Sequence, residues 1–191
     1  WLEDQDFWRL HGLFRSVELT AQPHVHVENM QLEADWDAES DTASLDAALS
    51  VRNASDAATI SATLKDSEGN VIWETSTNAD ANTTIASGSL QGLEPWSAEN
   101  PSLYELEVNI IDQAGNIVET AVQKVGFRRF RIENGIMTLN GKRIVFKGAD
   151  RHEFDAKHGR SITEQDMIDD VIFCKRHNIN AIHTSHYPNQ E

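Results

Sequence analysis

The sequence predicts a mainly β protein, in which an immunoglobulin-like β-sandwich is followed by the first βαβ unit of a parallel α/β domain. Seven stretches that alternate apolar and polar residues fall within roughly a hundred residues, which is typical of such a sandwich. A helical stretch between two apolar stretches follows them. The distribution of charge also changes between these two parts.

The change in charge marks a domain boundary. Residues 1–127 carry 22 acidic and 5 basic side chains, whereas residues 128–191 carry 9 acidic and 11 basic ones. We therefore predict three segments, which are residues 1–20, 21–127 and 128–191. The net charge of −15 disfavours nucleic acid and anionic membrane surfaces, so we expect neither as a partner.

Residues 1–20 are rich in aromatic and charged side chains, and Phe14, Val17 and Leu19 alternate as they would in a strand. So short a segment cannot complete a core of its own. We expect it to be the C-terminal tail of a domain that precedes the sandwich.

The sandwich is expected over residues 21–127, which contain no cysteine and must rest on apolar packing alone. Hairpin turns are predicted at residues 67–70 and 112–116, where Gly, Asn and Asp gather. The alternating pattern predicts strands at residues 24–36, 43–51, 58–64, 71–77, 83–90, 103–111 and 117–125.

The pattern changes after Gly126. Residues 137–139 and 143–146 flank Asn140-Gly141, which predicts a tight hairpin. Residues 144–147 and 179–182 are apolar and predict two buried strands. Between them Thr163 is expected to cap a helix with an apolar stripe. Two strands and one helix cannot close a parallel domain, so we expect this domain to be incomplete in the chain.

Two polar clusters follow the predicted strands, D-R-H-E at residues 150–153 and H-T-S-H-Y-P at residues 183–188. Parallel α/β domains build their active sites at the carboxyl ends of the strands. We therefore expect His152 and His186 to lie near each other on one rim. The alternative is that either imidazole only satisfies a loop carbonyl. Glu153 is the carboxylate that the first motif places at this rim.

The remaining histidines and the cysteine support weaker statements. His24 and His26 share one face of a predicted strand, but no third ligand follows at a metal-binding spacing, so surface positions are favoured. The lone Cys174 allows no intramolecular disulfide, which fits a reducing compartment. We therefore expect a cytoplasmic protein. No apolar run is long enough to span a membrane.

Three ordered motifs resemble the long β-galactosidases of glycoside hydrolase family 2. L-E-D-Q-D-F-W-R-L-H-G-L-F-R, at residues 2–15, is similar to the stretch that closes the family's N-terminal sugar-binding jelly roll. W-S-A-E-N-P-S-L-Y, at residues 96–104, is similar to a stretch of the family's sandwich domain. The pair L-N-G-K-R-I-V-F-K-G-A-D-R-H-E and N-I-N-A-I-H-T-S-H-Y-P resembles the first two strands of its catalytic (β/α)8 TIM barrel.

The resemblance implies a retaining β-galactosidase that hydrolyses terminal β-D-galactosides such as lactose. Asp6 matches an aspartate of the galactose site that also helps to hold sodium in sodium-dependent members. His152 and His186 match histidines that bond galactosyl hydroxyls and stabilise the transition state. The resemblance further implies a homo-oligomer that uses magnesium and, in some members, sodium. No metal or cofactor site besides Asp6 is expected within this chain.

One position departs from the family's pattern. The family has an arginine that contacts the nucleophilic carboxylate where this chain has His183. An imidazole is shorter and cannot form a bidentate fork, so we expect weaker orientation of the nucleophile. By the same resemblance, the acid/base and nucleophilic glutamates and the main magnesium ligands lie on later barrel strands. We expect no catalytic residue in this chain and no turnover by it alone.

Two other functions remain open at this point. The chain is alternatively a non-catalytic β-sandwich spacer or carbohydrate-binding module, and saturable binding of galactosides by residues 21–127 alone would favour this alternative. It is otherwise part of another family 2 glycosidase, a β-glucuronidase or a β-mannosidase. The motifs L-E-D-Q-D and R-H-E favour the galactosidase within this resemblance.

Overall fold

The computed structural model describes residues 12–189. The chain divides into two compact units. We call Ala21–Ile144 the sandwich unit, and Trp1–Thr20 together with Val145–Glu191 the βαβ unit. No helix of the described part is long and apolar enough to cross a membrane.

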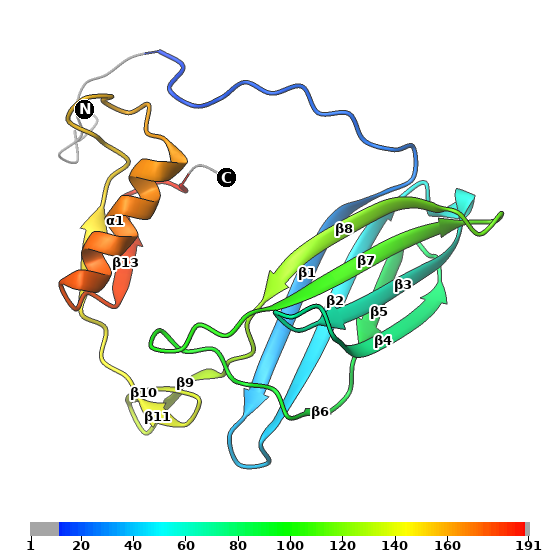
Figure 1. Ribbon diagram of the computed structural model, residues 1–191, viewed down its shortest axis with the longest axis horizontal. Coiled ribbons are helices and arrows are strands. Elements are labelled where there is room, and N and C mark those ends of the chain that lie inside the picture. The colour runs from blue at the N-terminus through cyan, green and yellow to red at the C-terminus, as the bar shows by residue number, and fades with distance from the viewer. Residues whose placement is uncertain (1–11, 190–191) are drawn as a thin grey trace. The chain divides into compact units, whose positions relative to one another are not determined.

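Two antiparallel sheets of the sandwich unit pack against each other, and Figure 1 shows them as two layers. In the first sheet β2 (Thr42–Arg52) pairs with β1 (His26–Asp37), β5 (Asn82–Ala86) and β6 (Leu90–Gln91). The second has the order β4 (Val71–Asn78), β3 (Ala57–Lys65), β7 (Tyr104–Asp112) and β8 (Ile117–Val125). A short 3-10 helix, Ala54–Asp56, joins β2 to β3. The predicted sandwich is confirmed.

Alternate residues of the strands form the core between the two sheets. In β2 every second residue from Ala43 to Val51 is buried, as the alternating pattern predicts. Ile60 and Leu64 of β3 and Leu106 of β7 have no exposed surface, and they belong to the same cluster. This packing holds the unit together without a disulfide.

Two predicted strands, one in the sandwich unit and one in residues 12–20, differ from the structure. The strand expected at residues 83–90 is divided into β5 and β6, because the chain turns at Gly88, whose φ is +66°. The strand expected around residues 14–19 is absent, and Val17 and Leu19 are exposed. An alternating pattern indicates a strand only where a partner strand is available to pair with it.

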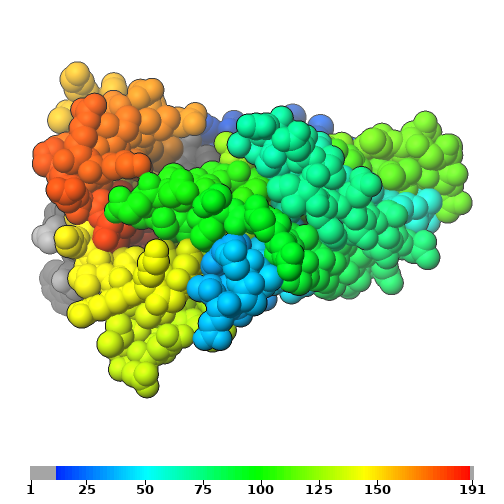
Figure 2. Space-filling model, turned by 60° about the horizontal axis from the view of Figure 1, so that its bottom comes forward, coloured from blue at the N-terminus to red at the C-terminus, as the bar shows by residue number. Residues whose placement is uncertain are grey.

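A three-stranded sheet ends the sandwich unit. It contains β9 (Phe130–Glu133), β10 (Ile136–Leu139) and β11 (Lys142–Arg143). Asn140 and Gly141 both have positive φ, which confirms the predicted tight turn, although the strand after it ends sooner than expected. Figure 2 shows this hairpin beside the loop that joins β1 to β2, and Arg129 bonds Asp35 and Asp37 there.

The βαβ unit consists of β12 (Gly148–Arg151), α1 (Glu164–Arg176) and β13 (Ala181–Thr184), and its two strands pair in parallel. Thr163 caps α1 in a reciprocal capping box with Asp166, which confirms the predicted helix start. Both strands begin later than predicted. Val145 and Phe146 are 52% and 48% exposed, since the strand forms where the chain pairs with β13 rather than where it is most apolar.

Candidate functional site

The site is built on the carboxyl ends of β12 and β13. Asp150 lies opposite His183 in the parallel register, and Arg151 lies opposite Thr184. His152 follows β12 directly, and His186 is the second residue after β13, so both imidazoles stand at the same rim. Their ring centroids are 5.6 Å apart and the rings are nearly perpendicular. The structure thus brings together the two histidines that the sequence singled out.

Neighbouring contacts fix the loop that carries His152. Its ring stacks on Phe154, with 5.3 Å between the centroids. The backbone N–H of Ser185, which is fully buried, donates to the carbonyl of Arg151 at 2.9 Å and joins the two loops. Arg151 also donates to Asp170 of α1 at 2.7 Å. Hydrogen bonds therefore connect the end of β12 both to the loop after β13 and to α1.

Glu153, the rim carboxylate that the sequence singled out, is only 2% exposed. Its Oε2 accepts a hydrogen bond from Nη2 of Arg15 at 2.9 Å. Its backbone N–H donates to the hydroxyl of Tyr187 at 3.1 Å. Sequence reasoning missed Arg15, because 138 positions separate the two partners and no local pattern links them. The one available signal was that Arg15 ends the first of the three motifs.

His183 lies within β13, and its Nδ1 is 2.9 Å from Oδ1 of Asp150 across the strand pair. Both side chains are exposed. The rings of His183 and His186 are 6.5 Å apart, so His183 belongs to the same rim. His183 is thus paired with Asp150, a contact that the sequence analysis did not predict. Asp6 lies outside the described residues.

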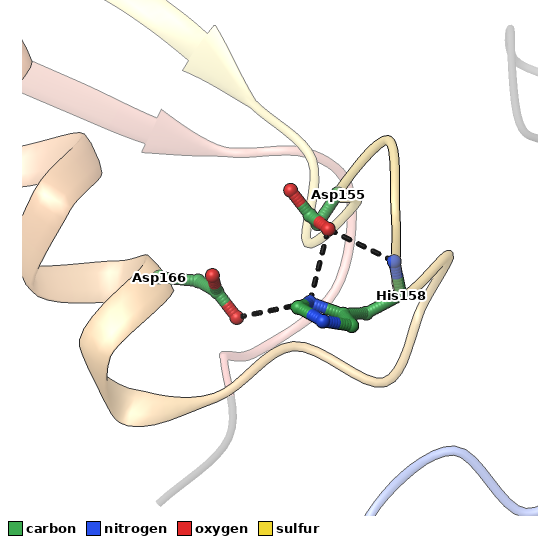
Figure 3. A group of neighbouring side chains, drawn as sticks. All are labelled: Asp155, His158 and Asp166. Carbon is green, nitrogen blue, oxygen red and sulfur yellow. Dashed lines mark hydrogen bonds and ion pairs between the residues drawn. The ribbon is translucent and has the colours of Figure 1, made fainter.

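Asp155, His158 and Asp166 form one further cluster, in the loop before α1 and in its first turn (Figure 3). Nδ1 of His158 lies 3.0 Å from Asp155 and 3.7 Å from Asp166. Backbone N–H groups of Lys157 and His158 lower the pKa of Asp155, and bonds from Thr163 lower that of Asp166.

The donor set of this cluster does not fit magnesium. That ion prefers six oxygen ligands in an octahedron, whereas these carboxylates already accept backbone hydrogen bonds and the third group is a nitrogen. Within residues 12–189 no other group of three such side chains stands close enough to hold an ion. The cluster is better described as an ion-paired turn at the start of the helix.

Two family models match the chain. Residues 25–128 match "Glycosyl hydrolases family 2", and residues 130–191 match "Glycosyl hydrolases family 2, TIM barrel domain". The two matches divide the chain close to the position at which its charge changes.

The chain is also similar to curated proteins along its whole length. It is 64% identical to "Beta-galactosidase BgaC" of Bifidobacterium adolescentis, over all of this chain and 19% of that protein. It is 46% identical to a "Beta-galactosidase" of Halalkalibacterium halodurans, over 99% of this chain and 19% of that protein. The chain thus spans about a fifth of the length of these relatives.

Among solved structures, the chain is similar to the apo form of Bacteroides uniformis β-glucuronidase 3. The TM-score is 0.84 at 30% identity, and the match covers 97% of this chain and 23% of that one. A Parabacteroides merdae β-glucuronidase has a TM-score of 0.78 at 23% identity, over 87% of this chain and 21% of that one, which supports the fold alone.

Proposed function

Because this chain belongs to family 2 of the glycosyl hydrolases, we propose that it is part of a retaining β-galactosidase and supplies residues of the galactose site. The observation that carries the proposal is the pair of imidazoles at the carboxyl rim of β12 and β13, 5.6 Å apart. That rim is where parallel α/β enzymes place their substrates. The similarity to proteins named β-galactosidase supports the choice of sugar.

In this proposal His152 and His186 hydrogen-bond the hydroxyl groups of a terminal β-D-galactoside such as lactose. Such bonds favour catalysis when they are stronger to the distorted, oxocarbenium-like sugar than to the ground state. Asp6 completes the sugar site and contributes to sodium binding. His183, held by Asp150 at 2.9 Å, occupies the position that orients the nucleophile.

The two catalytic carboxyl groups are proposed to come from other parts of the whole enzyme. A retaining glycosidase needs an acid/base and a nucleophile about 5 Å apart. The rim carboxylates of the described residues are engaged otherwise, Glu153 by Arg15 and Asp150 by His183. Magnesium is likewise assigned to other residues, since the Asp155 cluster does not fit it. We propose that the whole enzyme is a cytoplasmic homo-oligomer.

The test is hydrolysis of chromogenic β-galactosides, with protein made in a host that lacks its own β-galactosidase. The purified 191-residue chain should show no turnover. A longer protein that contains this chain should hydrolyse the galactoside, and His152→Ala should lower its kcat/KM by roughly 100-fold. Turnover that copurifies with the 191-residue chain and disappears in His152→Ala would overturn the assignment of the carboxyl groups.

A β-glucuronidase is the second candidate, favoured by the 30% identity to a solved β-glucuronidase over nearly the whole chain. The two kinds of substrate differ at C4, where the hydroxyl is axial in galactosides and equatorial in glucuronides, and at C6, which is a hydroxymethyl carbon in galactosides and a carboxylate carbon in glucuronides. The same longer protein should therefore be assayed on both chromogenic substrates. A higher kcat/KM on the glucuronide would replace the galactosidase proposal.

A further inference from the structure

We propose that Arg15 and Glu153 are positioning residues, whose ion pair joins the two loops that carry His152 and His186 and holds both imidazoles in place. The inference rests on the proposed function, because it assigns these histidines to the sugar site. Neither Arg15 nor Glu153 needs to touch the sugar. We call these two side chains together the Arg15–Glu153 anchor.

The anchor bridges both loops of the rim. Nη2 of Arg15 donates to Glu153, which follows His152 directly, and also to the backbone carbonyl of Pro188, two residues after His186. The backbone N–H of Glu153 donates to Tyr187, the residue next to His186. One guanidinium from residues 12–20 is thus bonded to the loop after β12 and to the loop after β13.

Aromatic packing holds the same segment in place. The guanidinium of Arg160 lies 4.0 Å from the ring centroid of Phe14, the residue before Arg15. It also lies 5.3 Å from the ring of Tyr187 and 5.8 Å from that of Phe154, which stacks on His152. Cation–π contacts of this kind favour a fixed arrangement of the rings. Two consecutive residues of the segment, Phe14 and Arg15, therefore pack on the loops of the rim.

Because Glu153 is buried, loss of its ion pair with Arg15 is expected to disturb the position of His152. The carboxylate of Glu153 is almost completely buried, whereas Arg15 is partly exposed. A buried carboxylate that loses its cation is strongly destabilised, so it moves toward water or draws in another group. Because Glu153 adjoins His152 in the chain, any such movement displaces that imidazole. A displacement of about 1 Å in a catalytic site lowers rates by up to roughly 100-fold.

The experiment uses the longer protein that contains this chain, with active sites counted by titration so that misfolded protein does not enter the rates. Arg15→Ala and Glu153→Gln should each lower kcat and kcat/KM by about 10- to 100-fold, with a much smaller change in KM. Arg15→Lys keeps the charge and should recover part of this loss. The double variant Arg15→Ala with Glu153→Gln should be no worse than either single variant, because both remove one unit.

The matched control is Arg52→Ala. Arg52 forms an ion pair with Glu28 at 2.7 Å, but both side chains are exposed and lie in the sandwich unit. This variant should leave kcat and KM unchanged. A lower melting temperature with unchanged kcat/KM per active site in Arg15→Ala and Glu153→Gln would overturn the anchor, since it would indicate a structural contact only. Additive losses in the double variant would overturn it as well.

Failure of the proposed function gives a different result. If the unaltered protein cleaves glucuronides instead of galactosides, the same variants are compared on the glucuronide. If it cleaves neither, crystal structures of the unaltered protein and of Arg15→Ala provide the measurement. A separation of the His152 and His186 rings that changes by about 1 Å or more supports the anchor, and an unchanged separation overturns it.

Discussion

At the scale of single residues, Arg129 shows how one side chain joins two elements of the sandwich unit. It stands just before β9, and its Nε donates to both carboxylate oxygens of Asp35 on β1, at 2.8 and 3.0 Å. Its Nη1 donates to Asp37 at 2.8 Å. Hydrogen bonds from Arg129 lower the pKa of Asp35 and contribute most to lowering the pKa of Asp37 to about 2.

The sign of the pH dependence follows from these pKa values. The folded-state pKa of each carboxyl group lies below its unfolded value of 3.8, so the folded state is stabilised above that pH. The contribution is lost as the pH falls from about 4 through about 2. Because all three side chains are partly exposed, solvent screening keeps the contribution modest.

We predict that Arg129→Ala lowers the melting temperature of the chain by a few degrees at pH 7 and by clearly less near pH 2.5. Thermal unfolding followed by circular dichroism at both pH values measures the difference. Arg52→Ala serves as the control, since its ion pair with Glu28 is more exposed and should change the melting temperature little at either pH. An equal decrease for Arg129→Ala at both pH values would show that packing, rather than charge, is responsible.

At the scale of elements, the central strands β3 and β7 carry the sandwich. They pair over nearly their whole lengths, and the register places Leu64 opposite Leu106. Both side chains are completely buried, whereas Val122 on the neighbouring strand β8 is 51% exposed. Val122 pairs with Glu107, the neighbour of Leu106, so it lies on the opposite face of the sheet, and alternation along the strands separates the apolar positions that fill the core from those that face solvent.

We predict that Leu106→Ala destabilises the chain by about 2–5 kcal/mol, the range for removal of a fully buried leucine side chain. Val122→Ala, on the exposed face, should change the free energy of unfolding by about 0.5 kcal/mol or less. Urea unfolding followed at a strand wavelength of circular dichroism measures both. A similar small effect of the two variants would contradict the sandwich core described above.

At the scale of the whole molecule, the two units differ in how much apolar surface they bury. The core cluster lies within the sandwich unit. In the βαβ unit α1 has no buried residue, and the apolar residues of its predicted stripe are exposed: Ile168, Val171 and Ile172. A helix with few buried apolar contacts unfolds locally at a low free-energy cost, so its backbone amides are little protected from exchange.

Hydrogen exchange of the isolated chain is expected to distinguish the units. Backbone amides of β12, α1 and β13 should exchange at least about tenfold faster than those of β3 and β7, because few buried contacts oppose their opening. Exchange measured by mass spectrometry on peptides of each unit provides the comparison. Equal protection in both units would mean that the βαβ unit is as stable as the sandwich in this chain.

The sequence by itself determined the elements whose signals are local. Alternating residues identified most strands of the sandwich, Asn140-Gly141 identified the tight turn, and Thr163 identified the start of α1. Each signal depends on the conformational preferences of a few neighbouring residues, so the local conformation that it predicts is also found in the folded chain. The same reasoning placed His152 and His186 after parallel strands, because strand direction follows from the connection between them.

Only the tertiary structure decided where β12 and β13 begin, which carboxylates are paired, and which segment meets the rim. The strands form where two segments share hydrogen bonds, and so β12 begins at Gly148 rather than in the more apolar residues before it. The pairs Arg15–Glu153 and Asp150–His183 join residues 138 and 33 positions apart. Such contacts depend on how distant segments pack in space, and no local preference of the chain encodes them.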